Sequence, residues 1–512
     1  MAPNVYLGLD SSTQGLAAVL IRVDAGRAEV LWQHDLEFDR ACPEFGTIHG
    51  VLASTDRHVK VSNPRMWVQA LDQMLTTLGQ SGVDLSSLRA ISGSAQQHGS
   101  VYLDDRSELS RPVAPIWMDS STSEECAEIT QALGGSAVLA QRTGSRAFER
   151  FTGPQIRKFS KLEPAAYGNT SRIHLVSSYL ASQLIDGDAP LEPGDASGMN
   201  LMDLKTRDWW PAAVAATAPG LASRLPRIVP SHSVIGTLAP RWQARLSCPP
   251  ARVIAWTGDN SSSVIGTGLV EEGRVAVSLG TSDTIFSLMH EPRVDTGGAG
   301  YVFGAPTGDY MGITVFKNGS LARERVRDAY GLDWDGFSVA LRSTPPGNHG
   351  RLMFPWFEPE ITPHVPGAGV RRVDLDPGDM PGNVRAVVEG QMMALANYSQ
   401  WMGVHAQVIH ATGGAAINRD ILQVMADVFD AEVAQFEVGN AACLGAALRA
   451  WHGDALAAGT PVSWADVTRD LATPTSVGRI TPGREAARVY AQLRRRYAEA
   501  SVQFLRGTHD DD

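Results

Sequence analysis

Cysteine is scarce in this chain of 512 residues, basic residues (44) are fewer than acidic ones (55), and long apolar runs are lacking. The four cysteines, at positions 42, 126, 248 and 443, include no C-x-x-C pair, so neither a zinc site nor a disulfide framework is indicated. Residues 1–4 have no basic segment leading into an apolar one, so we expect no signal peptide. Scattered free thiols are typical of a reducing compartment, and the sequence therefore predicts a cytoplasmic protein.

The charge balance and the short apolar segments exclude two classes of partner. A formal net charge of -11 argues against binding to nucleic acid or to an anionic membrane surface. No apolar run reaches the ~20 residues that span a bilayer. With 43% hydrophobic and 19% charged residues, the composition is that of a globular protein of two to four domains. A small-molecule partner fits best, with no nucleic acid and no membrane, and the protein is expected to be a monomer or homodimer.

Several nucleotide-binding and hydrolase signatures are also missing. The chain has no P-loop G-x-x-x-x-G-K-[ST], no dinucleotide-binding G-x-G-x-x-G, no H-E-x-x-H and no G-x-S-x-G. If the protein binds ATP, it does so without a P-loop.

A pattern of strand, small polar turn and strand occurs twice in the chain. Residues 5–9 and 16–23 are apolar and flank the turn DSSTQG, and residues 28–38 can form a third strand. Residues 274–279 and 284–289 flank a second turn, within SLGTSDT at 278–284. Such turns can point N–H groups and hydroxyls at an anion, although each alone is as readily a plain hairpin turn. Two copies, each opening one half of the chain, favour a duplicated domain with a phosphate turn in each half.

Other polar clusters follow predicted strands. A strand at 88–92 leads into GSAQQHG at 93–99, whose amides and imidazole can bind the hydroxyls of a polyol, although His98 alone is more readily a structural loop histidine. A strand at 407–411, a glycine turn and a helix at 419–429 can admit a planar or phosphorylated ligand. Asp259, in TGDN at 257–260, is a candidate acid/base carboxylate. Together these features suit phosphoryl transfer from ATP to an alcohol.

Five further predictions concern secondary structure. Asn63 and Pro64 begin a helix with a cap and an N1 proline, and Asn383 caps a second, long helix. We expect a helix at 173–184, a loop at 194–200 and a helix at 440–451, whose small residues allow close packing. Residues 292–310 are glycine-rich and indicate no function.

These motifs together resemble those of the FGGY family of carbohydrate kinases, in the actin/hexokinase/Hsp70 superfamily. The similarity runs over roughly residues 4 to 455. It is strongest in QQHGS at 96–100, WMDSST at 117–122, ERFTG at 149–153, TGDN at 257–260 and ATGG at 411–414. Within that family the motifs are most similar to those of the D-xylulose kinases. The resemblance implies an α/β fold of two ribonuclease-H-like (actin/hexokinase-type) domains, 1–267 and 268–512, with a ligand cleft between them.

The resemblance also implies a cytoplasmic enzyme that transfers phosphate from ATP, with Mg²⁺, to D-xylulose. Asp259 would be the general base for the terminal hydroxyl, and Asp10 would orient the magnesium ion directly or through water. The remaining site residues implied are, for the sugar, Gln97, His98, Asp119, Arg150 and Asn260, and for ATP, Ser12, Thr13, Gly280, Thr281, Ser282, Trp334, Gly413, Gly414, Ala415 and Asn418.

Two other interpretations stay open at the level of sequence. A sister kinase for ribulose, glycerol or another polyol would share the fold, although the Gln-Gln-His loop favours a ketopentose. A non-catalytic nucleotide switch or sugar sensor is the other, and the presence of Asp259 argues against it.

Overall fold

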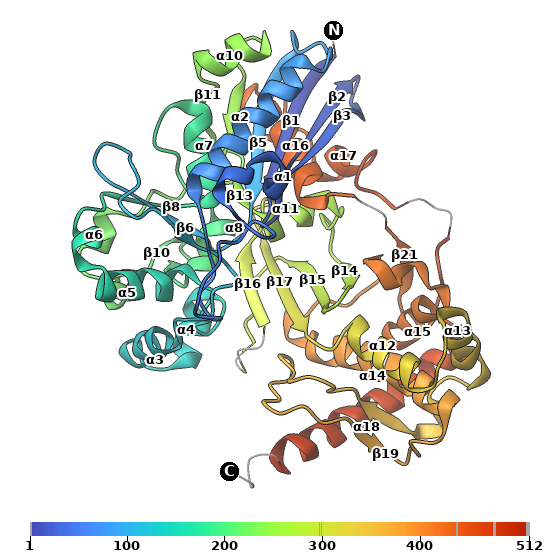
Figure 1. The fold of residues 1–512 in the computed structure, drawn as a ribbon. Coiled ribbons are helices and arrows are strands. Elements are labelled where there is room, and N and C mark those ends of the chain that lie inside the picture. Colours follow the sequence, from blue (N-terminus) through green and yellow to red (C-terminus); the bar gives the residue numbers. More distant parts are fainter. Residues whose placement is uncertain (1–2, 296, 298–299, 437–438, 475–477, 508–512) are drawn as a thin grey trace.

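Two sheets with a common core of three antiparallel and two parallel strands organise the computed structural model, which describes residues 3–507 apart from 296, 298–299, 437–438 and 475–477 (Figure 1). In the first sheet an antiparallel β1–β2–β3 meander continues through parallel β5 and β12 to β11. Its strands are β1 (Asn4–Ser11), β2 (Gly15–Asp24), β3 (Arg27–Glu37), β5 (Leu88–Ala95), β11 (Val234–Thr237), β12 (Arg252–Ile254) and β13 (Thr257–Gly258), which also pairs with β5.

The second sheet repeats this plan with residues from the second half. Its strand order is β16–β17–β15–β14–β20–β21. The first four strands are antiparallel to their neighbours, and β20 and β21 continue parallel to β14. These strands are β14 (Arg274–Leu279), β15 (Asp283–Met289), β16 (Gly300–Gly304), β17 (Tyr310–Phe316), β20 (Val408–Thr412) and β21 (Glu432–Gln435). The duplication predicted from the two polar turns is therefore confirmed, because one turn joins β1 to β2 and the other joins β14 to β15.

Helices bury the faces of both sheets. Near the first sheet and in the lobe beside it lie α2 (Pro64–Gln80), α3 (Ser123–Ala132), α4 (Ser136–Thr143), α5 (Thr152–Leu162), α6 (Pro164–Gly168), α7 (Val176–Ile185), α8 (Pro193–Ala196), α9 (Pro211–Thr217), α10 (Pro240–Leu246) and α11 (Asp259–Gly266). The second half adds α12 (Ser320–Ala329), α13 (Trp334–Ser343), α14 (Met380–Tyr398), α15 (Arg419–Phe429), α16 (Ala441–Ala457), α17 (Trp464–Thr468) and α18 (Arg484–Gly507). Within the described residues no helix is long and apolar enough to cross a bilayer.

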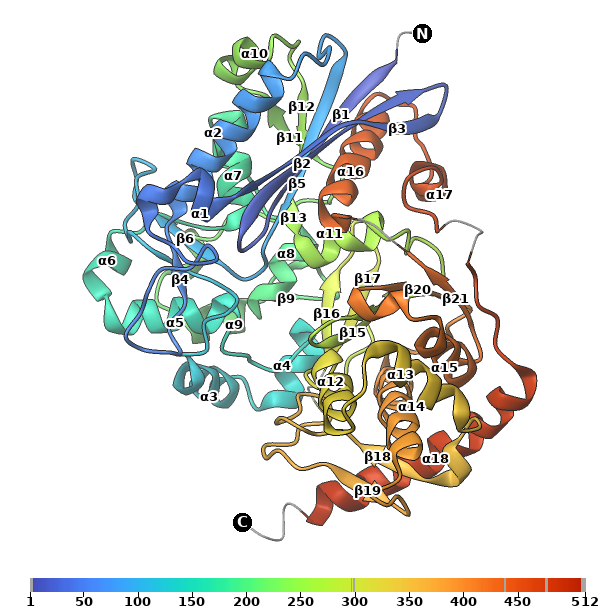
Figure 2. The ribbon, with the colours of Figure 1, turned by 45° about the vertical axis from the view of Figure 1, so that its right-hand side comes forward.

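Helix α16 belongs to the second half of the sequence but packs on the first sheet, as both views show (Figures 1 and 2). Its small residues allow this close approach. A Cβ at Gly8 on β1 would lie 2.3 Å from the backbone nitrogen of Ala447, and one at Gly445 would lie 2.1 Å from the carbonyl oxygen of Ser262 on α11. The predicted close packing of this helix is confirmed, and its partners are β1 and α11.

Three local predictions are corrected, while the cap at Asn63 is confirmed. The expected helix at 173–184 begins only at Val176, because β8 (Arg172–Leu175) pairs with β6 (Ser100–Leu103). The expected loop at 194–200 is the short helix α8 followed by a 3₁₀ turn at 197–199. Asp379, not Asn383, caps α14, since Pro381 stands in its first turn and the Asp379 carboxylate accepts from the Gly382 N–H.

Candidate active site

Two carboxylates meet at the end of the first sheet. Asp10 on β1 pairs in register with Ser94 on β5, which pairs with Thr257 on β13, so the first residue of α11, Asp259, follows beside this row. The Ser94 hydroxyl donates to Asp10 Oδ1 over 2.7 Å. Burial raises the pKa of Asp10 to about 6, against the lowering effect of the Ser94 hydrogen bond. Burial and the negative charge of Asp10 raise the pKa of Asp259 to about 7.

A network of amides orients the Asp259 carboxylate. Its Oδ1 accepts from the backbone N–H of Asn260 over 2.8 Å and from the Asn260 side-chain amide over 3.2 Å. The same Asn260 amide donates over 2.8 Å to Gln97 Oε1, and Gln97 Nε2 donates to the Gly194 carbonyl. Gly258 permits this arrangement, since a Cβ there would lie 2.3 Å from Cγ of Gln97. Gln97 therefore fixes Asn260 beside Asp259 and has its own polar atoms engaged within the protein.

His98 is buried next to this network in a conformation that leaves one ring nitrogen available. Its backbone has φ +72°, which is uncommon outside glycine and is often found at functional sites. Nδ1 lies 2.7 Å from the Gly198 carbonyl and must donate to it, because a carbonyl only accepts. Burial and the nearby Arg150 charge lower the His98 pKa to about 3. The ring is therefore neutral, with Nε2 as an acceptor for a ligand hydroxyl.

The two other residues predicted to hold the sugar, Arg150 and Asp119, have different surroundings. Arg150 is near enough to His98 to affect its pKa, and its guanidinium carbon lies 6.0 Å from the centre of the Tyr301 ring. Asp119 is buried, and both of its carboxylate oxygens are engaged. One accepts from the Lys60 N–H over 2.9 Å, and the other accepts from the N–H and hydroxyl of Ser121. In the structure, the Asp119 carboxylate therefore links the segment at Lys60 to the loop at 119–121.

The first polar turn, which was predicted to bind phosphate, is closed by its own side chains. Ser12 Oγ donates to the Gly15 carbonyl and accepts from the Gly15 N–H, at 3.1 and 3.2 Å. Thr13 Oγ1 accepts from the indole N–H of Trp117 over 2.8 Å. The Trp117 side chain thus links the WMDSST segment to the turn.

The second polar turn, Gly280 to Ser282, was also predicted to bind phosphate and is followed by a buried ion pair. Asp283, the first residue of β15, accepts two hydrogen bonds from the guanidinium of Arg323, at 2.9 and 3.1 Å, and Arg323 is completely buried. The Gly280 carbonyl accepts from the Ser320 N–H at the start of α12. The turn is therefore held from beneath by α12 and leaves its outer side available.

The residues expected around adenosine lie at the matching edge of the second sheet. Gly413 has φ +88°, and a Cβ there would lie 2.6 Å from the Leu279 carbonyl oxygen, so this turn touches the end of β14. Gly414 is exposed, with open space where a Cβ would stand. Asn418 caps α15 and donates to the hydroxyl of Ser338 on α13 over 2.8 Å.

Ala415 is half-buried on the same turn, and Trp334 is 39% exposed at the start of α13. The guanidinium of Arg327 lies over the Trp334 indole at 4.6 Å. The indole is thus fixed on one face while part of its surface stays open, as a residue that covers a flat ligand requires.

Sequence reasoning missed a layer of buried charge behind the carboxylate pair. Glu192 is fully buried and accepts from the hydroxyls of Thr257 and Ser231 and, over 2.9 Å, from the Asp195 N–H. Arg449 on α16 donates to the carbonyls of Gly93 and Ala255, at 3.1 and 2.6 Å, and burial lowers its pKa to about 10. An acid followed by proline is a helix-start signal, which could have drawn attention to 192–193; nothing local marks Arg449.

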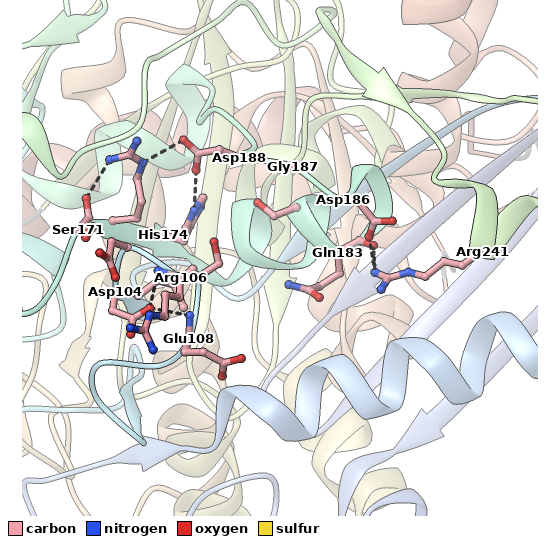
Figure 3. A pocket seen from close by; sticks show the side chains of 15 residues that line it. Asp104, Arg106, Glu108, Ser171, His174, Gln183, Asp186, Gly187, Asp188 and Arg241 are labelled. Carbon is pink, nitrogen blue, oxygen red and sulfur yellow. Dashed lines mark hydrogen bonds and ion pairs between the residues drawn. The ribbon is translucent and has the colours of Figure 1, made fainter.

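The cavity in Figure 3 is distinct from this site. It measures about 660 Å³ and lies between the loop at 104–108 and the end of α7. Several of its charged side chains pair with one another, since Asp188 pairs with Arg172 and His174, and Asp186 pairs with Arg241. Neither Asp10 nor Asp259 lines this cavity, so we assign it no part in the chemistry of the carboxylate pair.

Two ribonuclease-H-like sheets, with a carboxylate pair and paired polar turns at their ends, form the two-domain fold that is also found in solved sugar kinases. The model of the "FGGY family of carbohydrate kinases, N-terminal domain" matches residues 5–266, and that of the C-terminal domain matches 275–453. The chain belongs to the FGGY family of carbohydrate kinases and is an enzyme.

Individual relatives support this assignment over nearly the whole length. The chain is 42% identical to a xylulose kinase of Rattus norvegicus, over 98% of this chain and 97% of that protein. It is 37% identical to xylulose kinase 2 of Arabidopsis thaliana, over 88% of this chain and 87% of that one. The crystal structure of a xylulose kinase from Rhodospirillum rubrum shares the fold with a TM-score of 0.82 at 20% identity, covering 99% of this chain and 100% of that chain.

Proposed function

We propose that this protein is a xylulokinase that transfers the γ-phosphoryl group of ATP to the terminal hydroxyl of D-xylulose, giving D-xylulose 5-phosphate. The observation that carries the proposal is the pair of carboxylates, Asp10 and Asp259, beside the available acceptor of His98 and the guanidinium of Arg150. It is supported by the 42% identity to a xylulose kinase over 98% of the chain.

Asp259 is the general base in this mechanism. Its pKa of about 7 lies near neutral pH, where a base gains most from balancing its ionised fraction against its proton affinity. The carboxylate takes the proton of the sugar's terminal hydroxyl as that oxygen attacks the γ-phosphorus of ATP. His98 Nε2 accepts from a sugar hydroxyl, and Arg150 donates to another. The amide protons of Asn260 are engaged by Gln97 and Asp259, so its side-chain oxygen accepts from a third hydroxyl. Gln97 and Asp119 act one layer further out, on Asn260 and on the loop at 119–121.

The two polar turns and the glycine turn bind the nucleotide. Backbone N–H groups and hydroxyls of Thr13, Thr281 and Ser282, with the backbone of Gly280, face the phosphates. Ser12 shapes the first turn, because its N–H and its hydroxyl both donate to the Gly15 carbonyl. Gly413, Gly414, Ala415 and Asn418 flank adenosine, and Trp334 covers it. The division into domains 1–267 and 268–512 puts the base with the sugar site in one half and the adenosine turn in the other. Closure of the two halves would exclude water from the transfer.

Asp10 suits a magnesium ion. No cluster of three or more His, Cys, Asp or Glu side chains forms a metal cage within the residues described. Mg²⁺ in kinases needs no such cage, because it keeps waters and binds one or two carboxylates together with substrate phosphates. Asp10 is a buried carboxylate with a raised pKa, and a divalent cation would stabilise its ionised form. When bound, the ion would neutralise charge on the transferred phosphate.

The test is the initial rate of ADP release with Mg-ATP and a panel of D-xylulose, D-ribulose, L-xylulose, glycerol, D-fructose and no sugar. D-xylulose should give the highest kcat/KM by a wide margin. A preference for ribulose or glycerol would keep the mechanism and replace the substrate. If no sugar raises the rate above the blank, the catalytic assignment falls. Light scattering of the same sample tests the expected monomer or homodimer, and fractionation of source cells tests the cytoplasmic location.

A further inference from the structure

Four buried aromatic rings form a contiguous cluster next to the residues proposed to bind the sugar. This aromatic platform consists of Phe148 and Phe151, from the segment before α5, and Tyr301 and Phe303, from β16 of the second sheet. The Tyr301 ring lies 4.7 Å from Phe148 and 6.3 Å from Phe303, and the His98 ring stacks on Phe151 at 4.3 Å. The glycine-rich stretch that indicated no function at the level of sequence thus contributes two rings to the site.

Arg150 rests on this platform and not on a carboxylate. Within the described part of the chain, no acidic side chain forms an ion pair with Arg150, whereas Arg323 is bound by Asp283 through two hydrogen bonds. The Arg150 guanidinium carbon is 6.0 Å from the centre of the Tyr301 ring. A contact with the face of a ring leaves the N–H groups at the edge of a guanidinium available, while a bidentate carboxylate would occupy two of them.

We propose that Tyr301 is a positioning residue of the sugar site, which holds the Arg150 guanidinium with its ring face so that the N–H donors stay directed at the substrate. Because Tyr301 lies on β16, the sugar affinity of the first half would then depend on a residue supplied by the second half. This inference rests on the proposed function, in which Arg150 contacts the sugar.

Removing the Tyr301 hydroxyl, as in Tyr301→Phe, distinguishes a role of the aromatic ring from a role of the oxygen. Tyr301 is 4% exposed, and its hydroxyl oxygen is buried without a hydrogen-bond partner in the structure. Burial raises the pKa of this hydroxyl, so it stays neutral. If the ring face is what holds Arg150, phenylalanine must be able to replace tyrosine, and loss of an unpaired buried hydroxyl must not destabilise the fold.

The experiment is a double-mutant cycle on the sugar KM. Tyr301→Leu should raise the KM for D-xylulose roughly 3- to 30-fold, the range of a cation–π contact, with the KM for ATP unchanged. Tyr301→Phe should stay within about twofold of wild type. In the Arg150→Met background, Tyr301→Leu should add nothing, because both changes remove the same interaction. Tyr301→Met, closer in volume, replaces the leucine variant if the latter fails to fold.

Tyr310 on β17 provides the matched control. It is similarly buried, its ring lies 4.8 Å from the Arg207 guanidinium, and its hydroxyl donates to the Leu204 carbonyl. Tyr310→Leu should lower stability and leave the sugar KM unchanged.

Each other outcome has one meaning. If Arg150→Met leaves the sugar KM unchanged, the assignment of Arg150 in the proposed function is wrong. If Arg150→Met raises KM but Tyr301→Leu does not, the role of Tyr301 is overturned while the site assignment stands. If Tyr301→Phe is as damaging as Tyr301→Leu, or the two losses add in the double variant, Tyr301 acts through its hydroxyl or independently of Arg150, and the inference fails.

Discussion

Replacing Asp259 by asparagine should make this enzyme slower and more stable at once. The Asp259 pKa rises from 3.8 to about 7 in the folded protein because of burial and the charge of Asp10. A pKa difference of one between the folded and unfolded states corresponds to ~1.4 kcal/mol, so an ionised Asp259 costs the native state up to about 4 kcal/mol at pH 8. Asparagine keeps an oxygen for the Asn260 N–H and removes the charge. At ~2–4 °C per kcal/mol for domains of 150–250 residues, Tm should rise by about 10 °C.

The gain has a defined pH window. A carboxylate whose folded pKa is raised destabilises the native state where it must ionise, so the stability gain of Asp259→Asn is complete above pH 7. The gain in stability shrinks as the pH falls from about 7 to about 4, because native Asp259 takes up a proton in this range. The gain vanishes below the pKa of Asp259 in the unfolded chain, 3.8. Thermal melts at several pH values measure it. Asp105→Asn, at an exposed position, is the control and should shift neither Tm nor turnover.

Turnover should fall in the same variant by ~10²–10⁴-fold, the usual contribution of a general base, with sugar affinity kept. The wild-type kcat/KM should fall below about pH 7, where Asp259 of the free enzyme is protonated, and this limb should be absent from the residual activity of the variant. Near-wild-type turnover would reject the role of Asp259. A lower Tm of Asp259→Asn than of wild type at pH 8 would refute the inference that the ionised Asp259 destabilises the native state.

Three further substitutions test other parts of the structure. His98→Ala should raise the sugar KM with little change for ATP, and an unaltered sugar KM would return His98 to a purely structural role. Gly8→Ala should cost about 1–3 kcal/mol in chemical unfolding, because its Cβ meets the rigid backbone of α16, whereas Gly168→Ala, with open space around it, should be neutral; equal effects would refute the close contact. Arg323→Met should cost about 3–5 kcal/mol by leaving the buried Asp283 charge unpaired, and adding Asp283→Asn should restore part of the loss. A neutral Arg323→Met would mean that this ion pair does not support the second phosphate turn.

Much of the fold followed from local patterns that act within a few residues. The alternation of apolar side chains around DSSTQG and SLGTSDT predicted two hairpins, and both are present as β1–β2 and β14–β15. Asn63 caps its helix as expected. The predicted cap at Asn383 was wrong because two signals compete there, and the proline at 381 favours the earlier start at Asp379.

The composition of the site was predicted in part, since motifs name candidate side chains without saying what each one meets. The structure leaves an acceptor available on His98 but engages both Asp119 oxygens in local hydrogen bonds. Ser12 closes its own turn with its hydroxyl. Whether a polar atom faces a ligand or a neighbouring side chain depends on tertiary packing, which the spacing of motifs along the sequence does not reveal.

The sequence by itself determined the duplicated strand-and-turn pattern, the candidate carboxylate Asp259 and the absence of a P-loop. Only the tertiary structure decided that Asp10 lies close enough to raise the Asp259 pKa, and that Arg449 and Tyr301 reach the first half from the second. The physical reason is that strand and turn formation depend on neighbouring residues. Desolvation, charge coupling and ring contacts depend instead on distances between residues far apart in the chain, which exist only once the two sheets and α16 have packed.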